Sequence, residues 1–298
     1  MNAAWMMVLS SLLFATMSVC VKLASASYGA GEIVFYRGLV GALAIGIVYR
    51  ARGGSLRTAV PGMHVGRSAA GVAAMALWFY ALGGLPLATA TTLNYMSSVW
   101  MALFLIGGAI MFGAHRVEGL LVAAVLLGFA GVALVLRPSM DASQVWPALA
   151  GVLSGVLAAL AYLQLTALGR VGEPEERTVF YFNVGSMVLG GLLALGQGLG
   201  RHSVRGVLLL LAIGVLAAMA QMLLTRAYTV GRPLSNAVLQ YLGILFAFVY
   251  GVLLFDEGIT GLAVVGVVLI IAAGLMSTRV RARAPEPGDT RGRDPRAG

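Results

Sequence analysis

The chain has 298 residues, of which 60% are hydrophobic and only 10% are charged, and its mean hydropathy is +0.93. A soluble domain of this length could not cover its surface with so few charges, so the composition predicts an all-α integral membrane protein. The net charge of +9 would point to nucleic acid in a soluble protein, but no soluble basic domain is present. We therefore expect no nucleic-acid partner.

Ten apolar segments follow one another along the chain, and each is long enough to cross about 30 Å of hydrocarbon as a helix. The first ends in Ala24-Ser25-Ala26, which resembles a signal-peptide cleavage site, but no Lys or Arg precedes it. We expect it to be a retained helix. The predicted spans are 3–24, 31–49, 66–84, 87–112, 119–136, 147–169, 178–197, 205–228, 233–255 and 259–277.

The basic residues predict the orientation of the chain. If the N-terminus is cytoplasmic, twelve Lys or Arg residues lie on the inside before the distal tail and four lie on the outside. Arg67 counts among the inside residues. This bias predicts that both termini face the cytoplasm of a bacterial-type inner membrane. Residues 278–298, rich in Arg and Pro, are expected to form a disordered cytoplasmic tail.

Short sequence matches recur between the two halves of the chain at separations of 142 to 146 residues. They predict two five-helix repeats over residues 3–138 and 147–277. Because five is odd, the second repeat must cross the membrane in the opposite sense, and such inverted repeats suit alternating access. The matching segments are Val8-Leu9-Ser10 with Val152-Leu153-Ser154, Val34-Phe35-Tyr36 with Val179-Phe180-Tyr181, Asn94-Tyr95 with Gln240-Tyr241, and Gly119-Leu120 with Gly261-Leu262.

This organisation, with Phe35-Tyr36-Arg37 in the second span and Phe255-Asp256-Glu257 ending the ninth, resembles the EamA-type members of the drug/metabolite transporter superfamily. The resemblance covers residues 3–277. EamA-like halves usually end their fourth helix with Gly-Glu, where the first half has Gly113-Ala114-His115. Many relatives carry a proline within that helix, where this chain has Ser97-Ser98.

The resemblance implies a secondary transporter, more often an exporter, of a small metabolite such as an amino acid, an amino-acid derivative or an opine-type metallophore. Uptake of a vitamin or nucleoside-like metabolite, such as riboflavin or adenosylmethionine, is the alternative. We expect a small-molecule substrate in a lipid bilayer and a monomer or homodimer.

Arg37 lies inside the second span, where a guanidinium is costly in lipid and should face protein or water. Its planar fork suits a substrate carboxylate or phosphate. A pair with Glu32, or snorkelling to the interface, would serve structure alone. The second half has Phe182 at the matching position, so an arginine site here would be asymmetric.

Polar and aromatic side chains on shared helix faces are further candidates for lining a substrate cavity. In the fourth and ninth spans they would line the cavity where the repeats meet, or join helices by amide hydrogen bonds. The candidate substrate-binding residues are Arg37, Trp78, Tyr80, Thr91, Asn94, Ser98, Tyr162, Asn183, Gln221, Asn236 and Gln240.

Other kinds of site are not indicated. The lone Cys20 excludes an internal disulfide, and no phosphate loop or metal-ligand cluster is present. Asp and Glu occur only near helix ends, in loops or in the tail, which leaves facilitated diffusion, exchange, or coupling through Glu32. We predict no cofactor, no metal and no catalytic residue. A membrane enzyme acting on lipid substrates would have its best candidate cluster at His115, Arg116 and Glu118.

Overall fold

The fold comes from a computed structural model, which describes residues 2–85, 87–112, 118–136, 142–197, 200, 202–255 and 260–283. All regular structure in these residues is helical, which confirms the predicted all-α class. Gly113-Ala114-His115, Arg116 and Asp256-Glu257 lie outside the described residues. The helices are α1 (Ala3–Ala24), α2 (Ala30–Ala51), α3 (Pro61–Gly84), α4 (Leu87–Tyr95), α5 (Ser97–Phe112), α6 (Gly119–Leu136), the 3₁₀ turn η1 (Ala142–Gln144), α7 (Val145–Arg170), α8 (Glu175–Gln197), α9 (Val204–Val230), α10 (Pro233–Gln240), α11 (Leu242–Phe255) and α12 (Gly261–Arg283).

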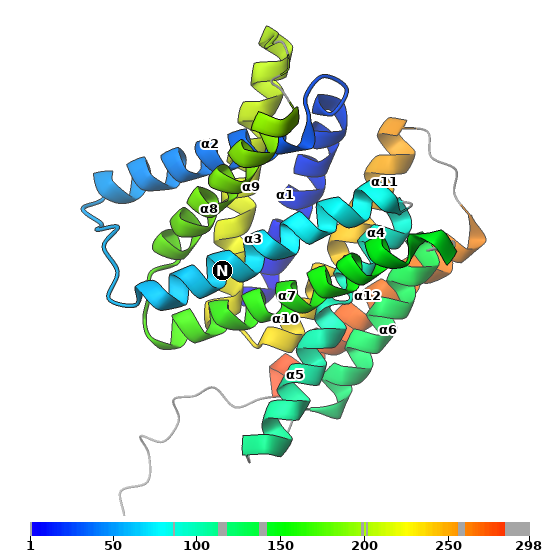
Figure 1. The fold of residues 1–298 in the computed structure, drawn as a ribbon. Helices are drawn as coiled ribbons and strands as arrows, with labels where there is room; N and C mark the ends of the chain where they lie inside the picture. Colours follow the sequence, from blue (N-terminus) through cyan, green and yellow to red (C-terminus); the bar gives the residue numbers. More distant parts are fainter. Residues whose placement is uncertain are drawn as a thin grey trace, which may run out of the picture.

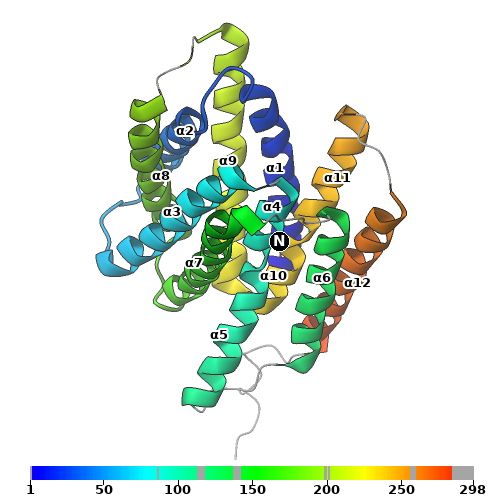
Figure 2. The same ribbon diagram turned by 45° about the vertical axis from the view of Figure 1, so that its right-hand side comes forward.

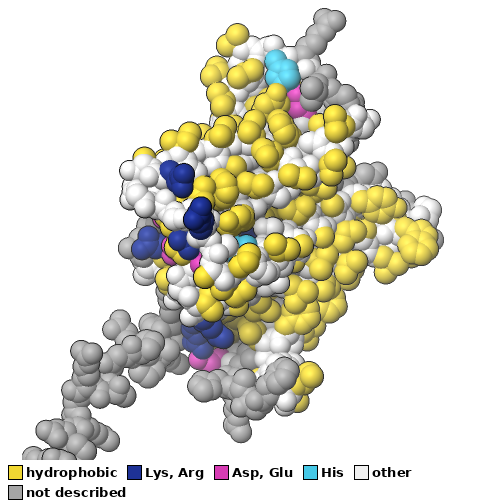
Figure 3. All heavy atoms as spheres, turned by 60° about the vertical axis from the view of Figure 1, so that its left-hand side comes forward, with side chains coloured by type: hydrophobic (Ala, Val, Ile, Leu, Met, Phe, Trp, Pro, Cys, Tyr) yellow, Lys and Arg dark blue, Asp and Glu magenta, His cyan; other side chains and the backbone are white. Residues whose placement is uncertain are grey.

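Within the described residues, eight helical segments are long and apolar enough to cross a membrane. They include α4 with α5, and α10 with α11, each pair counted as one segment. The apolar part of α12, Gly261–Ser277, is shorter, and α3 is not among the eight. Large hydrophobic side chains cover the outside, and Figure 3 shows them over most of one face, with Lys and Arg gathered to one side. The chain is a multi-pass membrane protein.

Four pairs of helices make the most extensive contacts: α1 with α9, α2 with α8, α3 with α7, and α6 with α12 (Figures 1 and 2). In the α2–α8 pair, Gly31 faces Ala194 and Gly46 faces Phe180, so these two helices are antiparallel. Their backbones nearly touch, because a Cβ on Gly38 would lie 2.5 Å from the Met187 nitrogen. The start of α2 therefore lies beside the end of α8.

Two of the predicted spans are interrupted. The fourth divides into α4 and α5 at Met96, and the ninth into α10 and α11 at Tyr241. The two breaks stand at matching places in the two halves, 145 residues apart in the sequence. Broken helices of this kind commonly expose backbone groups near the substrate site of a transporter.

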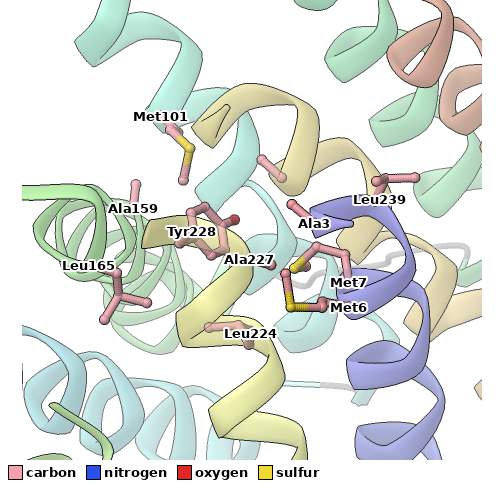
Figure 4. Close-up of a cluster of buried hydrophobic side chains, with 11 residues drawn as sticks. Ala3, Met6, Met7, Met101, Ala159, Leu165, Leu224, Ala227, Tyr228 and Leu239 are labelled. Atoms are coloured by element: carbon pink, nitrogen blue, oxygen red, sulfur yellow. The ribbon is translucent and has the colours of Figure 1, made fainter. Parts of the chain in front are cut away.

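Helices from both halves share one buried core (Figure 4). Tyr228 of α9 packs there with Met101 of α5 and Leu165 of α7, and with Met6 and Met7 of α1. The Tyr228 side chain is fully buried, although it carries a hydroxyl group. A buried hydroxyl requires a hydrogen-bond partner, and the partner of the Tyr228 hydroxyl is described with the candidate site below.

Two predicted boundaries are wrong. Helix α3 begins at Pro61 rather than at residue 66, because a proline suits the first turn of a helix, where its missing N–H costs nothing. At the other end, α12 continues to Arg283, so the tail does not begin at 278. Residues 284–298 lie outside the described residues.

Candidate functional site

Two arginines, on α2 and α3, approach one aromatic ring on α8. The guanidinium carbon of Arg67, on α3, lies 4.4 Å from the centroid of the Phe182 ring on α8. That of Arg37, on α2, lies 5.8 Å from the same centroid. We call Arg37 and Arg67 the arginine pair. Both distances allow a favourable cation–π interaction with the ring.

The arginine pair has no counter-ion among the described residues. Arg67 is 3% exposed and Arg37 is half-buried. Arg37 Nη1 and Arg67 Nε and Nη1 are buried without a hydrogen-bond partner in the described part of the chain. Glu32 does not pair with Arg37; it lies 3.1 Å from His202 instead. Burying one unpaired guanidinium costs several kcal/mol, so this arrangement needs a compensating ligand or water.

A hydrogen-bonded group of three side chains adjoins the arginine pair. Gln240 Nε2 donates to the Tyr162 hydroxyl at 2.8 Å, and the Tyr228 hydroxyl donates to Gln240 Oε1 at 3.3 Å. The rings of Tyr162 and Tyr228 stack, with centroids 5.1 Å apart and planes at 4°. Tyr162 lies within electrostatic range of both arginines, so we treat these polar side chains and the arginine pair as one candidate site.

Other predicted residues join helices. Ser98 donates to the Ala237 carbonyl at 3.1 Å, and Asn236 donates to the Ala227 carbonyl at 2.5 Å. Asn94 donates to the Ser154 hydroxyl at 2.9 Å, which links α4 to α7. These contacts fit the alternative in which buried polar groups hold a helix bundle together.

The remaining predicted residues are dispersed. Asn183 is buried where α2 crosses α8, against Gly41. Gln221 is buried on α9, while Thr91 and Trp78 are half-buried on α4 and α3. Tyr80 is 59% exposed. It stands two positions from Trp78 on the same helix, so the two side chains point in different directions and Tyr80 is not brought to the site.

At one end of the α2–α8 pair, a carboxylate is fully buried. Glu32, in the first turn of α2, lies 3.1 Å from His202 and accepts a hydrogen bond of 2.9 Å from the Gly200 nitrogen. The same His202 nitrogen lies 2.9 Å from the Tyr36 hydroxyl, and the Tyr28 ring packs against the imidazole. We call Tyr28, Glu32, Tyr36 and His202 the Glu32 cluster. It ties the start of α2 to the loop before α9.

A similar group occupies the other end of the pair. Glu173, in the loop between α7 and α8, lies 2.9 Å from His64 and 3.2 Å from Arg177, and the Tyr181 ring packs on His64. We call His64, Glu173, Arg177 and Tyr181 the Glu173 cluster. Arg177 and Tyr181 also donate to the carbonyls of Ser55 and Leu56, in the loop before α3.

Hydrogen bonding changes the acidity of Glu173. Burial raises the pKa of its carboxyl group, but hydrogen bonds from His64, Thr58 and Arg177, with the charge of Arg177, outweigh burial. The net result is a pKa below the usual 4.5. The ionised form of Glu173 is therefore the form that the Glu173 cluster stabilises.

The two clusters are related by the sequence register of the halves. Tyr36 corresponds to Tyr181, at a separation of 145 residues, and each tyrosine packs on a histidine. Because α2 and α8 are antiparallel, the start of each helix lies beside the end of the other, so the Glu32 cluster and the Glu173 cluster lie at opposite ends of the pair. Each end thus carries a tyrosine, a histidine and a glutamate in contact.

Sequence reasoning missed Arg67 and did not use Phe182 as a site residue. The predicted span 66–84 makes Arg67 its second residue, at the cytoplasmic end, and Arg67 therefore counts among the inside residues. Pro61 was the available signal: a helix starting there places Arg67 within its second turn.

The residues proposed for the enzyme alternative are only partly described. Glu118 forms an ion pair with Arg232, across the ends of α6 and α10. Among the described residues, no second acid, base or nucleophile joins this pair in a hydrogen bond or ion pair. A partly exposed pair of this kind serves to hold two helix ends together.

One open cavity of about 390 Å³ lies between α3 and α8. Its lining is mostly apolar, with Val65, Ala69, Val72 and Val184 among its residues, and His64 and Tyr181 at one end. Such a lining offers few groups for a polar substrate. We therefore centre the candidate site on the arginine pair and Tyr162.

Together, the fold and the site define a multi-pass membrane protein with charged and aromatic side chains enclosed among its helices. The chain belongs to the EamA-like transporter family, whose family model matches residues 1–137 and 145–279. Both the predicted membership and the predicted class, a membrane transporter of small organic molecules, are confirmed.

Two relatives have named activities. The pseudopaline exporter CntI of Pseudomonas aeruginosa is 33% identical over 275 residues, which cover 92% of this chain and 95% of that protein. A riboflavin transporter of Rhizobium johnstonii is 30% identical over 225 residues, which cover 76% of this chain and 72% of that protein. A solved crystal structure has a TM-score of 0.81 at 19% identity, covering 95% of this chain and 99% of that chain, and shows the likeness of fold.

Proposed function

We propose that this chain exports a small organic metabolite across the inner membrane by alternating access, with ten crossings arranged as two inverted five-helix repeats. The repeats are residues 3–138 and 147–277, and both termini face the cytoplasm. The protein acts as a monomer or homodimer without a cofactor. Transport draws on ion coupling, exchange or the substrate gradient, because ATP-driven pumping needs a phosphate loop that the sequence lacks.

The observation that carries the proposal is that the main helix contacts are preserved when each helix of one half is exchanged for its equivalent in the other half. If α1, α2, α3, α4–α5 and α6 are exchanged with α7, α8, α9, α10–α11 and α12, the α1–α9 contact becomes the α7–α3 contact. The α2–α8 and α6–α12 contacts map onto themselves. The two stretches matched by the family model and the matching breaks at Met96 and Tyr241 add support. Two equivalent halves can exchange conformations, which opens the centre first to one side and then to the other.

The two ends of the α2–α8 pair supply the closures that alternating access needs. The Glu32 cluster joins α2 to the loop before α9, while the Glu173 cluster joins α8 to the loop before α3. We assign the Glu32 cluster to the periplasmic closure and the Glu173 cluster to the cytoplasmic closure. In each half of the cycle one cluster separates while the other stays formed.

The substrate class and the direction rest on the relatives and on the site. One relative, aligned over 92% of this chain, is named a pseudopaline exporter, which favours export of an amino-acid derivative or opine-type metallophore. Uptake of a vitamin or nucleoside-like metabolite is the second candidate, favoured by the relative named a riboflavin transporter. The arginine pair favours the first, because it suits an acidic substrate.

Membrane vesicles of both orientations test the function and the direction. Vesicles from cells with and without the chain are incubated with an isotope-labelled extract of small metabolites, and their contents are measured by mass spectrometry. Export predicts that a small metabolite enters everted vesicles only when the chain is present. Entry confined to right-side-out vesicles would establish uptake instead, and no chain-dependent entry in either orientation would overturn transport.

A further inference from the structure

We propose that the arginine pair binds a substrate with at least two carboxylate groups, one for each guanidinium, held against the face of Phe182. This inference rests on the proposed transport function and names the chemical class of its substrate. It assigns a role to Arg67 and Phe182 in addition to Arg37.

The two guanidinium groups converge from different helices on one small volume. Both guanidinium carbons lie over the ring of Phe182, so they are no farther apart than the two ring distances combined. Arg67 cannot be snorkelling to an interface, because it is 3% exposed. Its Nε and Nη1 atoms are buried without partners in the described residues, and such donors need an acceptor.

The charge balance points to a dianion. Arg37 and Arg67 interact electrostatically with each other, and as like charges they repel. In the described part of the chain, the glutamates that form ion pairs do so with His64, Arg177, His202 and Arg232, so none of these pairs neutralises the arginine pair. One carboxylate would leave a buried positive charge uncompensated, whereas two carboxylates balance both guanidiniums, each through its planar fork.

Tyr162, which lies within electrostatic range of both arginines, can supply a further donor. Its hydroxyl oxygen accepts a hydrogen bond from Gln240, and within the described residues its own O–H has no acceptor. Gln240 holds the Tyr162 oxygen in place, so the hydroxyl proton is free to point at a bound carboxylate. We assign Tyr162 as a third donor to one of the two carboxylates.

Binding to the purified full-length chain in detergent tests the inference without requiring transport. The probes are glutarate, its monomethyl ester and its dimethyl ester, compared at equal ionic strength by the shift they cause in the thermal unfolding midpoint. We expect glutarate to raise the midpoint most and the dimethyl ester not at all, because a ligand stabilises only the state that it binds. Equal shifts with glutarate and the monoester, or a shift with inorganic phosphate as large as that with glutarate, would overturn the two-carboxylate site.

Variants locate the binding on the arginine pair. Arg37→Gln and Arg67→Gln should each weaken glutarate binding about tenfold or more. Arg226→Gln is the matched control, because Arg226 is exposed on α9. Tyr162→Phe should weaken binding less than either arginine variant, because it removes one neutral donor and no charge. Unchanged binding in both arginine variants would overturn the assignment.

The inference and the proposed function can fail separately. Diacid-selective binding that depends on the arginine pair, without chain-dependent flux in vesicles, would reject transport and keep the anion site. Flux of a substrate that carries no carboxylate, undiminished by Arg67→Gln, would keep transport and reject the anion site.

Discussion

The guanidinium carbon of Arg67 lies 4.4 Å from the centroid of the Phe182 ring. Phe182 in the second half of the chain corresponds to Arg37 in the first half. Arg37 contacts the same ring. One half therefore contributes two charges and the other an aromatic surface. A pair of equivalent halves thus encloses an asymmetric centre, and substrate selection depends on the differences between the halves.

Removing a charge from the arginine pair should stabilise the empty protein. Arg67→Met replaces an unpaired buried guanidinium with an apolar side chain of similar length and should raise the unfolding free energy by about 1–3 kcal/mol. Thermal unfolding of the purified chain without ligand measures this. Arg226→Met, on the exposed face of α9, is the control and should change little. A lower midpoint for Arg67→Met than for the control would contradict an uncompensated charge at Arg67.

Gly71, one helical turn after Arg67, leaves the space that the Arg67 guanidinium occupies. A Cβ on Gly71 would collide with the Arg67 guanidinium and lie 2.9 Å from the Phe182 ring. We expect Gly71→Ala to displace the flexible arginine, to shift the Phe182 ring and so to weaken glutarate binding. Gly62→Ala on the same helix is the control, since its Cβ would meet nothing within 4 Å. Equal glutarate binding by the two variants would show that Gly71 does not position Arg67.

The Tyr162–Gln240 hydrogen bond should show energetic coupling. Gln240→Leu removes the amide that bonds the hydroxyls of Tyr162 and Tyr228 and should cost about 1–3 kcal/mol of stability. If Tyr162 is already phenylalanine, the same change should cost less. A double-mutant cycle on unfolding free energies measures the difference, and additive values would indicate that the two side chains do not share a bond.

The single cysteine reports on one closure. Cys20 is half-buried and packs against the group of residues that contains Tyr28 and Ile33, beside the Glu32 cluster. Glu32→Gln weakens that closure and should speed labelling of Cys20 by a thiol reagent. Glu173→Gln weakens the closure at the opposite end and should slow labelling or leave it unchanged. Faster labelling in both variants would argue against two closures that separate in alternation.

The lowered pKa of Glu173 gives a pH dependence with a definite sign. Because its pKa in the folded protein lies below that of the unfolded chain, the stability it contributes is present above the unfolded value, near 4.5. That contribution disappears as the pH falls through the folded value. The midpoint difference between the wild type and Glu173→Gln should therefore be largest near pH 7 and shrink in acid. A difference that grew on acidification would contradict the assigned pKa direction.

The helical class and most element boundaries could be predicted, because the length and apolar character of each segment can be read from that segment alone. The breaks at Met96 and Tyr241 could not, because neither residue is a proline or a glycine.

Part of the candidate site could be proposed from the sequence. Tyr162, Gln240 and Arg37 are polar groups on apolar helices; a hydrogen bond joins the first two, and Arg37 lies within electrostatic range of Tyr162. Sequence alone could not separate Ser98 and Asn236, which bond to backbone carbonyls of neighbouring helices, from residues that face the site. Arg67 could not be recognised as a site residue, because the predicted start of α3 was five residues too late.

Metabolite profiling inside and outside living cells tests the central claim most directly. Cells that produce the wild-type chain, the Arg67→Gln variant or no chain are compared by mass spectrometry of cell contents and medium. We predict one small metabolite with two or more carboxylates that leaves wild-type cells and accumulates inside the other two. Identical profiles in the three strains, or a depleted metabolite without acidic groups, would contradict export through the arginine pair.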